Sequence, residues 1–176
     1  MKIRKASKHD VPTIANIHSV SWQENYRSVL SKQYLEDRVP MERMRLWKDR
    51  FEHPKSNQQV FLAEVEGNIA GFICLYMDNH PDWGTHLDNL HVRKGYHSMG
   101  VGKALFIEGA RRAYQQAPHR GMCLLVNQDN IKAQSFYQKL GGRQVQESIW
   151  HAPDGSKVPT YWYIWEQLNE LVDLDQ

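Results

Sequence analysis

The stretch that decides the fold of this chain reads Val92-Arg93-Lys94-Gly95-Tyr96-His97-Ser98-Met99-Gly100-Val101-Gly102-Lys103. It is a turn of small residues between an extended segment and a segment with helical spacing. Backbone N–H groups point outward at a helix start, and the helix dipole adds about half a positive charge there. Because glycines let an anion approach the backbone closely, the stretch predicts a phosphate-binding turn. On local grounds alone, the same glycines fit a tight turn or close helix packing equally well.

Two widespread phosphate-binding signatures do not fit this turn. A Walker loop needs Gly-Lys-Ser/Thr after a longer glycine spacing, whereas Ala104 follows Lys103 here. The dinucleotide fingerprint needs Gly-x-Gly-x-x-Gly inside an alternating βαβ unit. The segments that precede the turn instead form a strong hairpin signal, with extended runs at 60–65 and 69–77 around Glu66-Gly67-Asn68.

Flanking segments alternate between extended and helical patterns. Asp10 and Pro12 predict the N-cap and first turn of a helix, and Gly141-Gly142 predicts a left-handed helix end. The further predicted strands are 3–5, 86–92, 122–126, 144–150 and 160–165, and the predicted helices are 11–28, 40–53, 100–117 and 130–140.

Composition and charge limit the class of protein. The 176 residues are 41% hydrophobic and 24% charged, which is typical of one globular domain, here expected to span 1–176. A net charge of +2 gives no argument for nucleic acid or an anionic membrane as partner, and the sequence leaves a homodimer open. With no apolar stretch of signal or spanning length, a cytoplasmic location is expected. Cys74 and Cys123 each lie in an apolar run and read as small buried residues.

Two motifs in register carry a resemblance to a known family. The first joins Leu90-His91-Val92, at the end of a predicted strand, to His97-Ser98-Met99-Gly100-Val101-Gly102. The second has the form Asn-x-x-Ala-x-x-Phe-Tyr-x-x-Leu-Gly and consists of Asn130, Ala133, Phe136-Tyr137 and Leu140-Gly141. Together they resemble the GCN5-related N-acetyltransferase (GNAT) family, and the likeness covers essentially the whole chain.

The resemblance implies an α+β (mixed α/β) GNAT fold. Its central mixed sheet would be mostly antiparallel, with about six to seven strands, a splayed parallel pair and about four flanking helices. The implied activity is acetyl transfer from acetyl-CoA, as co-substrate, to a primary amine of a small molecule or peptide. A non-catalytic acetyl-CoA sensor with the same pocket is the alternative.

The resemblance also implies which residues bind acetyl-CoA. The turn would hold the pyrophosphate, and the pantetheine arm would pair with the preceding strand edge as an added strand does. His97 stands where the family prefers Arg or Gln, so the phosphate contact would rest on backbone N–H groups. The implied set is Leu90, His91, Val92, His97, Ser98, Met99, Gly100, Val101, Gly102, Lys103, Asn130 and Tyr137. Asn130 fits a simple helix cap equally well.

For catalysis, the resemblance implies that Tyr137 is the general acid, protonating the thiolate that leaves. A tyrosine pKa near 10 keeps the hydroxyl protonated at neutral pH. Without the motif, Tyr137 would read as a core residue beside Phe136 and Leu140.

The acceptor amine must lose a proton before it attacks. An amine of pKa about 10.4 lies roughly 3.4 units, or about 4.6 kcal/mol, from its reactive form at pH 7. His86 and Asp88 share one face of the predicted strand by alternation, and Asp88 ranks slightly ahead of His86 as the base. A plain hydrogen-bonding or solvated role fits each of them equally well.

No metal site is expected. His86 and His91 are an odd number of residues apart and would face opposite sides of an ideal strand, which argues against a group with His97. The resemblance implies that Trp22, Tyr26, the helices to about 53 and the aromatic 150–165 hairpin overhang the acceptor cleft, whereas a core role suits most of these aromatics better on their own. Polyamine, amino acid, aminoglycoside and protein N-terminus all stay open as acceptors.

Overall fold

The computed structural model describes residues 1–173, which form one seven-stranded sheet with five α-helices. The strands are β1 (Lys2–Lys5), β2 (Gln58–Val65), β3 (Asn68–His80), β4 (Gly84–Val92), β5 (Met122–Asn127), β6 (Arg143–His151) and β7 (Lys157–Trp165). The helices are α1 (Val11–Asn25), α2 (Val39–Glu52), α3 (Val101–Gln116), α4 (Ile131–Lys139) and α5 (Asn169–Asp173). The strand order is β1-β2-β3-β4-β5-β7-β6, and the pair β4–β5 is parallel.

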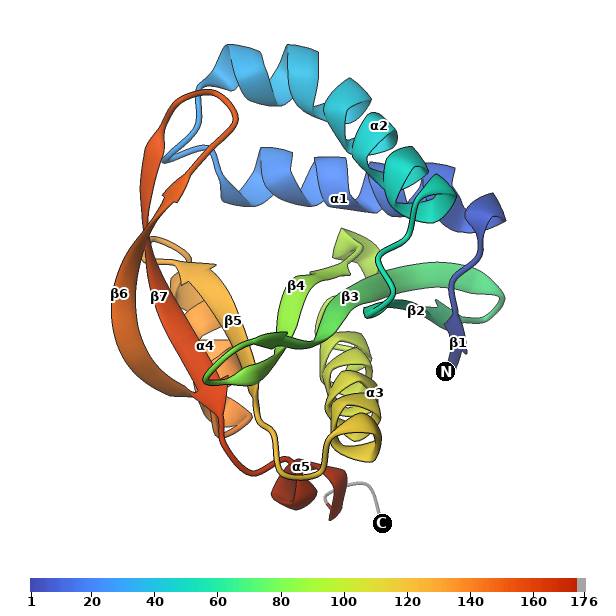
Figure 1. Ribbon diagram of the computed structural model, residues 1–176. Helices are drawn as coiled ribbons and strands as arrows, with labels where there is room; N and C mark the ends of the chain where they lie inside the picture. The colour runs from blue at the N-terminus through green and yellow to red at the C-terminus, as the bar shows by residue number, and fades with distance from the viewer. Residues whose placement is uncertain (174–176) are drawn as a thin grey trace.

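Helices cover both faces of the sheet. Figure 1 shows α1 and α2 together on one side of β2, β3 and β4, with α3 on the other side. Alternate residues of β3 serve the two layers, because successive strand side chains point to opposite faces. Phe72 packs with Trp47 of α2 in one core, and Ile73 packs with Phe106 of α3 in the other.

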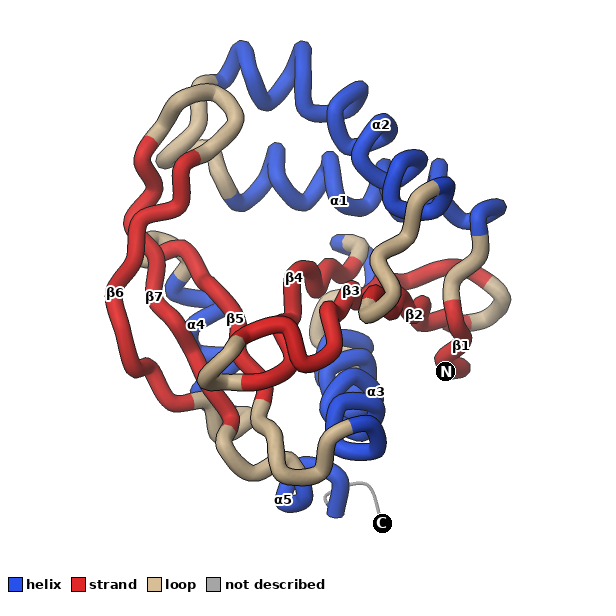
Figure 2. Tube along the Cα trace, in the orientation of Figure 1, coloured by secondary structure: helices blue, strands red, loops and turns tan. Residues whose placement is uncertain are grey.

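The parallel strands β4 and β5 pair only at their starts. Thr85 pairs with Met122 and His86 pairs with Cys123, and the remaining residues of the two strands have no partner across this junction. The courses of β4 and β5 can be followed in Figure 2. The expected splayed parallel pair is therefore present, and the edges of β4 and β5 beyond these residues are available to a ligand.

A bulge interrupts β4 just before this open edge. Cys74 of β3 pairs with Asn89 and Leu75 pairs with Leu87, so Asp88 is the extra residue. A bulge shifts the in–out alternation of a strand by one residue. The residues that follow Asp88 consequently face the opposite side from the one that simple alternation predicts.

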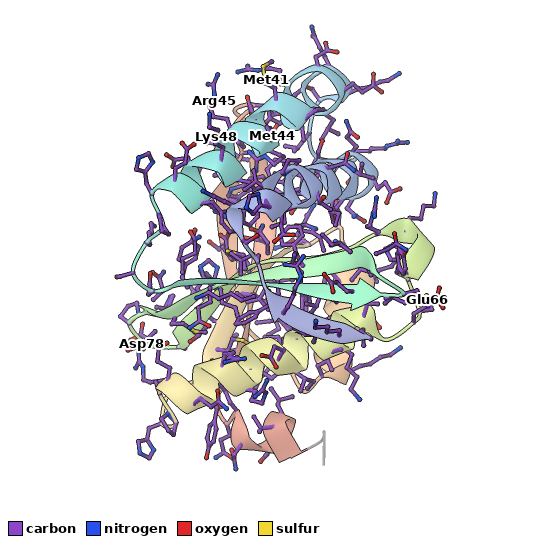
Figure 3. The ribbon with its side chains drawn as sticks, turned by 90° about the vertical axis from the view of Figure 1, so that its right-hand side faces the viewer. Met41, Met44, Arg45, Lys48, Glu66 and Asp78 are labelled. Carbon is purple, nitrogen blue, oxygen red and sulfur yellow. The ribbon has the colours of Figure 1, made fainter. Side chains whose placement is uncertain are left out.

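Turns and helix ends mostly follow the sequence signals. Glu66 and Gly67 both have positive φ, 51° and 80°, in the hairpin turn between β2 and β3, and Gly141 ends α4 with φ 81°. Figure 3 shows Glu66 and Asp78 at opposite ends of the sheet, and Met41, Met44, Arg45 and Lys48 on the outer surface of α2. The expected side-chain N-cap at Asp10 is absent, because its carboxylate binds Arg4 and the Ser7 N–H instead.

The predicted α+β fold is confirmed, with small differences at its edges. α1 ends at Asn25 rather than near 28, and a π-helical turn at Tyr34–Arg38 leads into α2. The short helix α5 has no counterpart among the predicted helices. Within the described part of the chain, no helix combines the length and the apolar character that a membrane span needs.

Candidate active site

A cavity of about 930 Å³ lies where β4 and β5 separate. Thirteen of the fourteen residues that the sequence singles out line it: His86, Asp88, Leu90, His91, Val92, His97, Ser98, Gly100, Val101, Gly102, Lys103, Asn130 and Tyr137. The exception is Met99, which does not line the cavity and is 55% exposed. The predicted residues thus converge on one site. Its end at α3 is called the co-substrate end, and its end beneath α1 and α2 the acceptor end, after the ligands that the sequence leads us to expect.

The start of α3 forms an anion-binding turn at one end of the cavity. Its first backbone hydrogen bond runs from the Ala104 N–H to the Gly100 carbonyl, at 3.0 Å, so the N–H groups of Val101, Gly102 and Lys103 lack helical partners. Gly100 has φ 77°, and a Cβ there would meet no atom within 4 Å. The glycine therefore serves both the left-handed backbone and an open approach for an anion.

Gly102 and His97 in the same turn have other contacts. A Cβ on Gly102 would lie 3.5 Å from the Phe136 ring, an ordinary van der Waals contact, so the packing of α3 against α4 does not itself require a glycine here. The His97 Nε2 atom lies 2.9 Å from the Val92 carbonyl oxygen, so the imidazole turns back onto the end of β4. The turn consequently presents its backbone to the cavity.

Unpaired polar atoms mark the wall formed by β5 and β7. Asn127 Nδ2 and Thr160 Oγ1 are buried without hydrogen-bond partners, and both residues line the cavity. The Asn130 side chain accepts a hydrogen bond from the Ala133 N–H at 3.1 Å and is a true N-cap of α4. Buried polar groups are normally paired, so Asn127 and Thr160 are suited to hydrogen-bond an amide-bearing ligand.

Tyr137 reaches the cavity from α4. It is 8% exposed and packs against Phe106, Phe136 and Trp165. Burial, with a smaller effect of the neighbouring Tyr26, raises the pKa of its hydroxyl above the ordinary value. The hydroxyl is therefore protonated at neutral pH and able to donate.

The two base candidates on β4 differ in their surroundings. Asp88 accepts a hydrogen bond from Arg50 at 2.8 Å, and the same Arg50 nitrogen also donates to Asn89 Oδ1 at 3.0 Å. His86 lies beside the Trp162 ring, with ring centroids 5.7 Å apart, and burial lowers its pKa. His86 is consequently neutral at pH 7 and has a lone pair to accept a proton, whereas Asp88 is held in an ion pair.

A chain of side chains at the acceptor end joins His91, which the sequence singles out as a co-substrate contact, to His18 and Ser21, which it does not single out. His18 of α1 is buried, accepts a hydrogen bond from Trp47 Nε1 at 3.0 Å and stacks on His91 at 4.7 Å. His91 Nδ1 lies 2.8 Å from Ser21 Oγ, and burial lowers its pKa to about 4. His18 falls on the helical apolar stripe of α1, so its sequence position indicates only a core residue.

Aromatic rings and one arginine complete this end. Trp22, Tyr26 and Trp150 pack on one another at centroid distances of 5.1 to 5.8 Å, and all three line the cavity. Arg43 of α2 lies over the Trp22 ring at 4.2 Å. Trp22 and Tyr26 therefore line the cavity, and their expected place over an acceptor stays a prediction.

The argument that His86 and His91 face opposite sides of β4 is wrong. His86 pairs with Tyr76 and His91 pairs with Phe72, and both partners lie on the α1–α2 side of β3. The bulge at Asp88 brings the two histidines onto one face. Over the described residues, no group of three His, Cys, Asp or Glu side chains has an arrangement that could hold a metal ion.

Comparison with known protein families decides the relationship. Residues 12–142 match the model of the acetyltransferase (GNAT) family, and this range includes α1, the turn at α3 and Tyr137. The chain belongs to the GNAT family. It is accordingly an acyltransferase, and acetyl-CoA is its co-substrate.

Relatives of the GNAT chain are N-acetyltransferases. It is 28% identical to a probable N-acetyltransferase of Mycobacterium tuberculosis, over 93% of this chain and 92% of that protein. It is 26% identical to a spermidine N(1)-acetyltransferase of Thermoplasma acidophilum, over 80% of this chain and 87% of that protein.

Solved GNAT structures share the fold. A GCN5-related N-acetyltransferase from Rhodopseudomonas palustris superposes with a TM-score of 0.74 at 19% identity, covering 94% of each chain. The PaiA N-acetyltransferase of Thermoplasma acidophilum, solved with coenzyme A, gives a TM-score of 0.68 at 20% identity, covering 90% of this chain and 96% of that one.

The GNAT site described above fits acetyl-CoA on its own geometry. The free N–H groups of Val101 to Lys103 suit its phosphates. The space beside Gly100, where a Cβ would meet no atom within 4 Å, is open to a phosphate group. The open edges of β4 and β5 and the unpaired Asn127 Nδ2 suit its amide-bearing arm.

Proposed function

We propose that this GNAT enzyme transfers an acetyl group directly to a primary amine of a small molecule or peptide. The observation that carries the proposal is the single cavity in which the anion-binding turn, the protonated Tyr137 hydroxyl and the α1–α2 side chains meet. Acetyl-CoA supplies the acetyl group as a thioester. The amine nitrogen bonds to the acetyl carbon, and the carbon–sulfur bond breaks.

In this proposal Tyr137 is the general acid. Tyr137 lines the cavity, and its raised pKa keeps the proton on the hydroxyl until a strong base forms beside it. A departing thiolate is such a base, because its charge is poorly solvated in a buried site. The proton passes from the Tyr137 oxygen to the sulfur.

The proton of the amine passes to a group on β4. His86, neutral because burial lowers its pKa, accepts it directly or through a water. Asp88, fixed by Arg50, lies two residues away and stabilises the imidazolium that results. This reverses the order expected from the sequence, in which Asp88 ranked first, because the Arg50 hydrogen bonds occupy the Asp88 carboxylate.

The cysteine and serine nucleophiles of the protein are poorly suited to form an acyl-enzyme, which favours direct transfer. Burial raises the pKa of Cys74 and of Cys123 to about 12, and neither residue lines the cavity. Ser21 has a histidine partner in His91, but a pKa of about 4 makes His91 a weak base.

The test mixes purified protein, acetyl-CoA and a broad amine panel, and measures thiol release together with the mass of the acetylated product. We expect release that depends on the amine, and no acetyl group on the protein after incubation with acetyl-CoA alone. Binding of acetyl-CoA without release on any amine would favour the sensor instead. A stable acetyl-enzyme would overturn direct transfer.

A further inference from the structure

Arg43 is a buried cation without a carboxylate partner. In residues 1–52, three arginines are not exposed: Arg4, Arg43 and Arg50. Arg4 is paired with Asp10 and Glu64, and Arg50 is paired with Asp88. Arg43 is 9% exposed, yet throughout residues 1–173 it has no ion pair and no hydrogen bond, and its Nε atom is buried and unsatisfied. A buried charge without a partner is costly, and arginine does not lose its proton to avoid the cost.

The position of Arg43 connects this cost to the acceptor. Its side chain lines the cavity and lies flat over Trp22, so the ring compensates one face of the guanidinium and leaves its edge unpaired. Burial lowers the pKa of Arg43, which shows that nearby carboxylates do not offset the loss of water. Arg43 belongs to α2, on the opposite face of the sheet from α3 and its phosphate-binding turn.

A second unpaired donor flanks the same ring. The His18 and Trp22 rings lie 5.4 Å apart, and His18 Nδ1 is occupied as the acceptor for Trp47. A neutral imidazole that accepts at Nδ1 carries its hydrogen on Nε2, and this His18 atom is buried without a partner. Arg43 and His18 therefore each carry an N–H donor without a protein acceptor, and both residues line the acceptor end of the cavity.

We propose that the acceptor amine also carries an anionic oxygen group, a carboxylate or a phosphate, which binds Arg43 with His18 as a second donor. This inference rests on the proposed amine acetylation and narrows its substrate class. The anion fixes the acceptor by one end, so that its amine faces His86 and the thioester. Amino acids, peptides with a free carboxylate and amino phosphates fit this description.

A polyamine does not fit. Its additional ammonium groups would approach Arg43 without gaining a free anion, because the lining carboxylates Asp88 and Glu24 are already paired with Arg50 and Lys94. Like charges in a partly dry site repel strongly. The spermidine acetylation named for the Thermoplasma relative therefore does not extend to this enzyme.

The first test uses the wild-type protein and matched acceptors. Amino acids of increasing chain length are compared with their amides, with an amino alkyl phosphate of similar length and with spermidine. We expect kcat/KM to favour an anionic acceptor over its neutral amide by roughly 10- to 100-fold, the range of a charge-assisted hydrogen bond. The carboxylate and phosphate arms identify the anion. Equal or better use of the amides or of spermidine would overturn the inference.

The second test uses variants of α2. Arg43→Gln should remove most of the preference for the anionic acceptor, so the ratio of kcat/KM between the anionic acceptor and its neutral amide should fall toward one. Arg43→Lys should restore part of it, because lysine keeps the charge but not the fork of donors. Arg45→Gln is the matched control, because this substitution removes the same charge from the outer surface of the same helix (Figure 3).

The outcomes separate this inference from the proposed function. If no amine at all is acetylated, the proposed function fails. If Arg43→Gln lowers activity equally on anionic and neutral acceptors, with acetyl-CoA affinity unchanged, Arg43 is only a structural support for Trp22, and the inference is wrong.

Discussion

The two ends of the cavity are built from different material. The co-substrate end is made of backbone and glycine: the free N–H groups at the start of α3, the left-handed Gly100 and the open edges of β4 and β5. The acceptor end is made of large side chains, Trp22 and His18 from α1 and Arg43 from α2. A ligand shared by a whole family can be bound by main-chain geometry, whereas a ligand peculiar to one member needs side chains that can vary.

The largest effect should follow from removing the side chain that supports the acceptor end. Trp47 is fully buried, and its indole N–H donates to His18. Trp47→Ala leaves a cavity and an unsatisfied imidazole, so we expect the free energy of unfolding to fall by about 3–5 kcal/mol, measured by urea titration. Met44→Ala, on the exposed side of α2 in Figure 3, should change it by less than about 0.5 kcal/mol. Similar values for both variants would mean that Trp47 does not hold this end together.

The next effect concerns the point where the two ends meet. Tyr137→Phe removes the proposed acid while keeping the ring, so kcat should fall about 100-fold and acetyl-CoA affinity should change by less than about threefold. Tyr163→Phe is the control, since this buried hydroxyl bonds Gln138 outside the cavity. Unchanged turnover in Tyr137→Phe would remove Tyr137 from the mechanism.

Acid should weaken the acceptor end more than the co-substrate end. Burial lowers the pKa of His18 and His91 in the folded state, so the unfolded chain takes up protons first as pH falls below about 6.5. Stability present above that value should be lost progressively toward pH about 4, by roughly 1–2 kcal/mol at pH 5. Unfolding measured across this range checks the slope. The slope should be smaller in His91→Phe, which removes one of the two buried imidazoles.

The smallest effect should come from the co-substrate turn. Gly100→Ala puts a Cβ on a residue with φ 77° and into the space beside the free N–H groups. We expect about 1 kcal/mol of strain and roughly a fivefold weaker acetyl-CoA affinity, measured by calorimetry. Gly95→Ala, in the same turn with no contact to its added Cβ and no positive φ, should bind normally. Equal affinities for both variants would separate Gly100 from the anion site.

The same contrast explains what could be predicted from the sequence. The phosphate-binding turn and the cap at Asn130 rest on contiguous residues whose spacing carries the geometry, and they predicted the fold and the co-substrate. Arg43 and His18 carry no such signal, because their proposed role depends on the lack of a hydrogen-bond partner in the protein. Only the folded structure shows which side chains surround them. The wrong placement of His91 arose from the bulge at Asp88, since no residue type at that position announces a break in alternation.

The short junction between β4 and β5 divides the sheet into two parts that a ligand can connect. Among the described residues, β4 and β5 pair at Thr85–Met122 and His86–Cys123 alone, so the strands β1–β4 and β5–β7 form two parts of the sheet with a short junction between them. The amide-bearing arm of acetyl-CoA, hydrogen-bonded to both open edges, would connect the two parts of the sheet. Hydrogen exchange in Leu90 to Val92 and Leu124 to Val126 should then slow when acetyl-CoA binds, while exchange in the β2–β3 hairpin should stay unchanged.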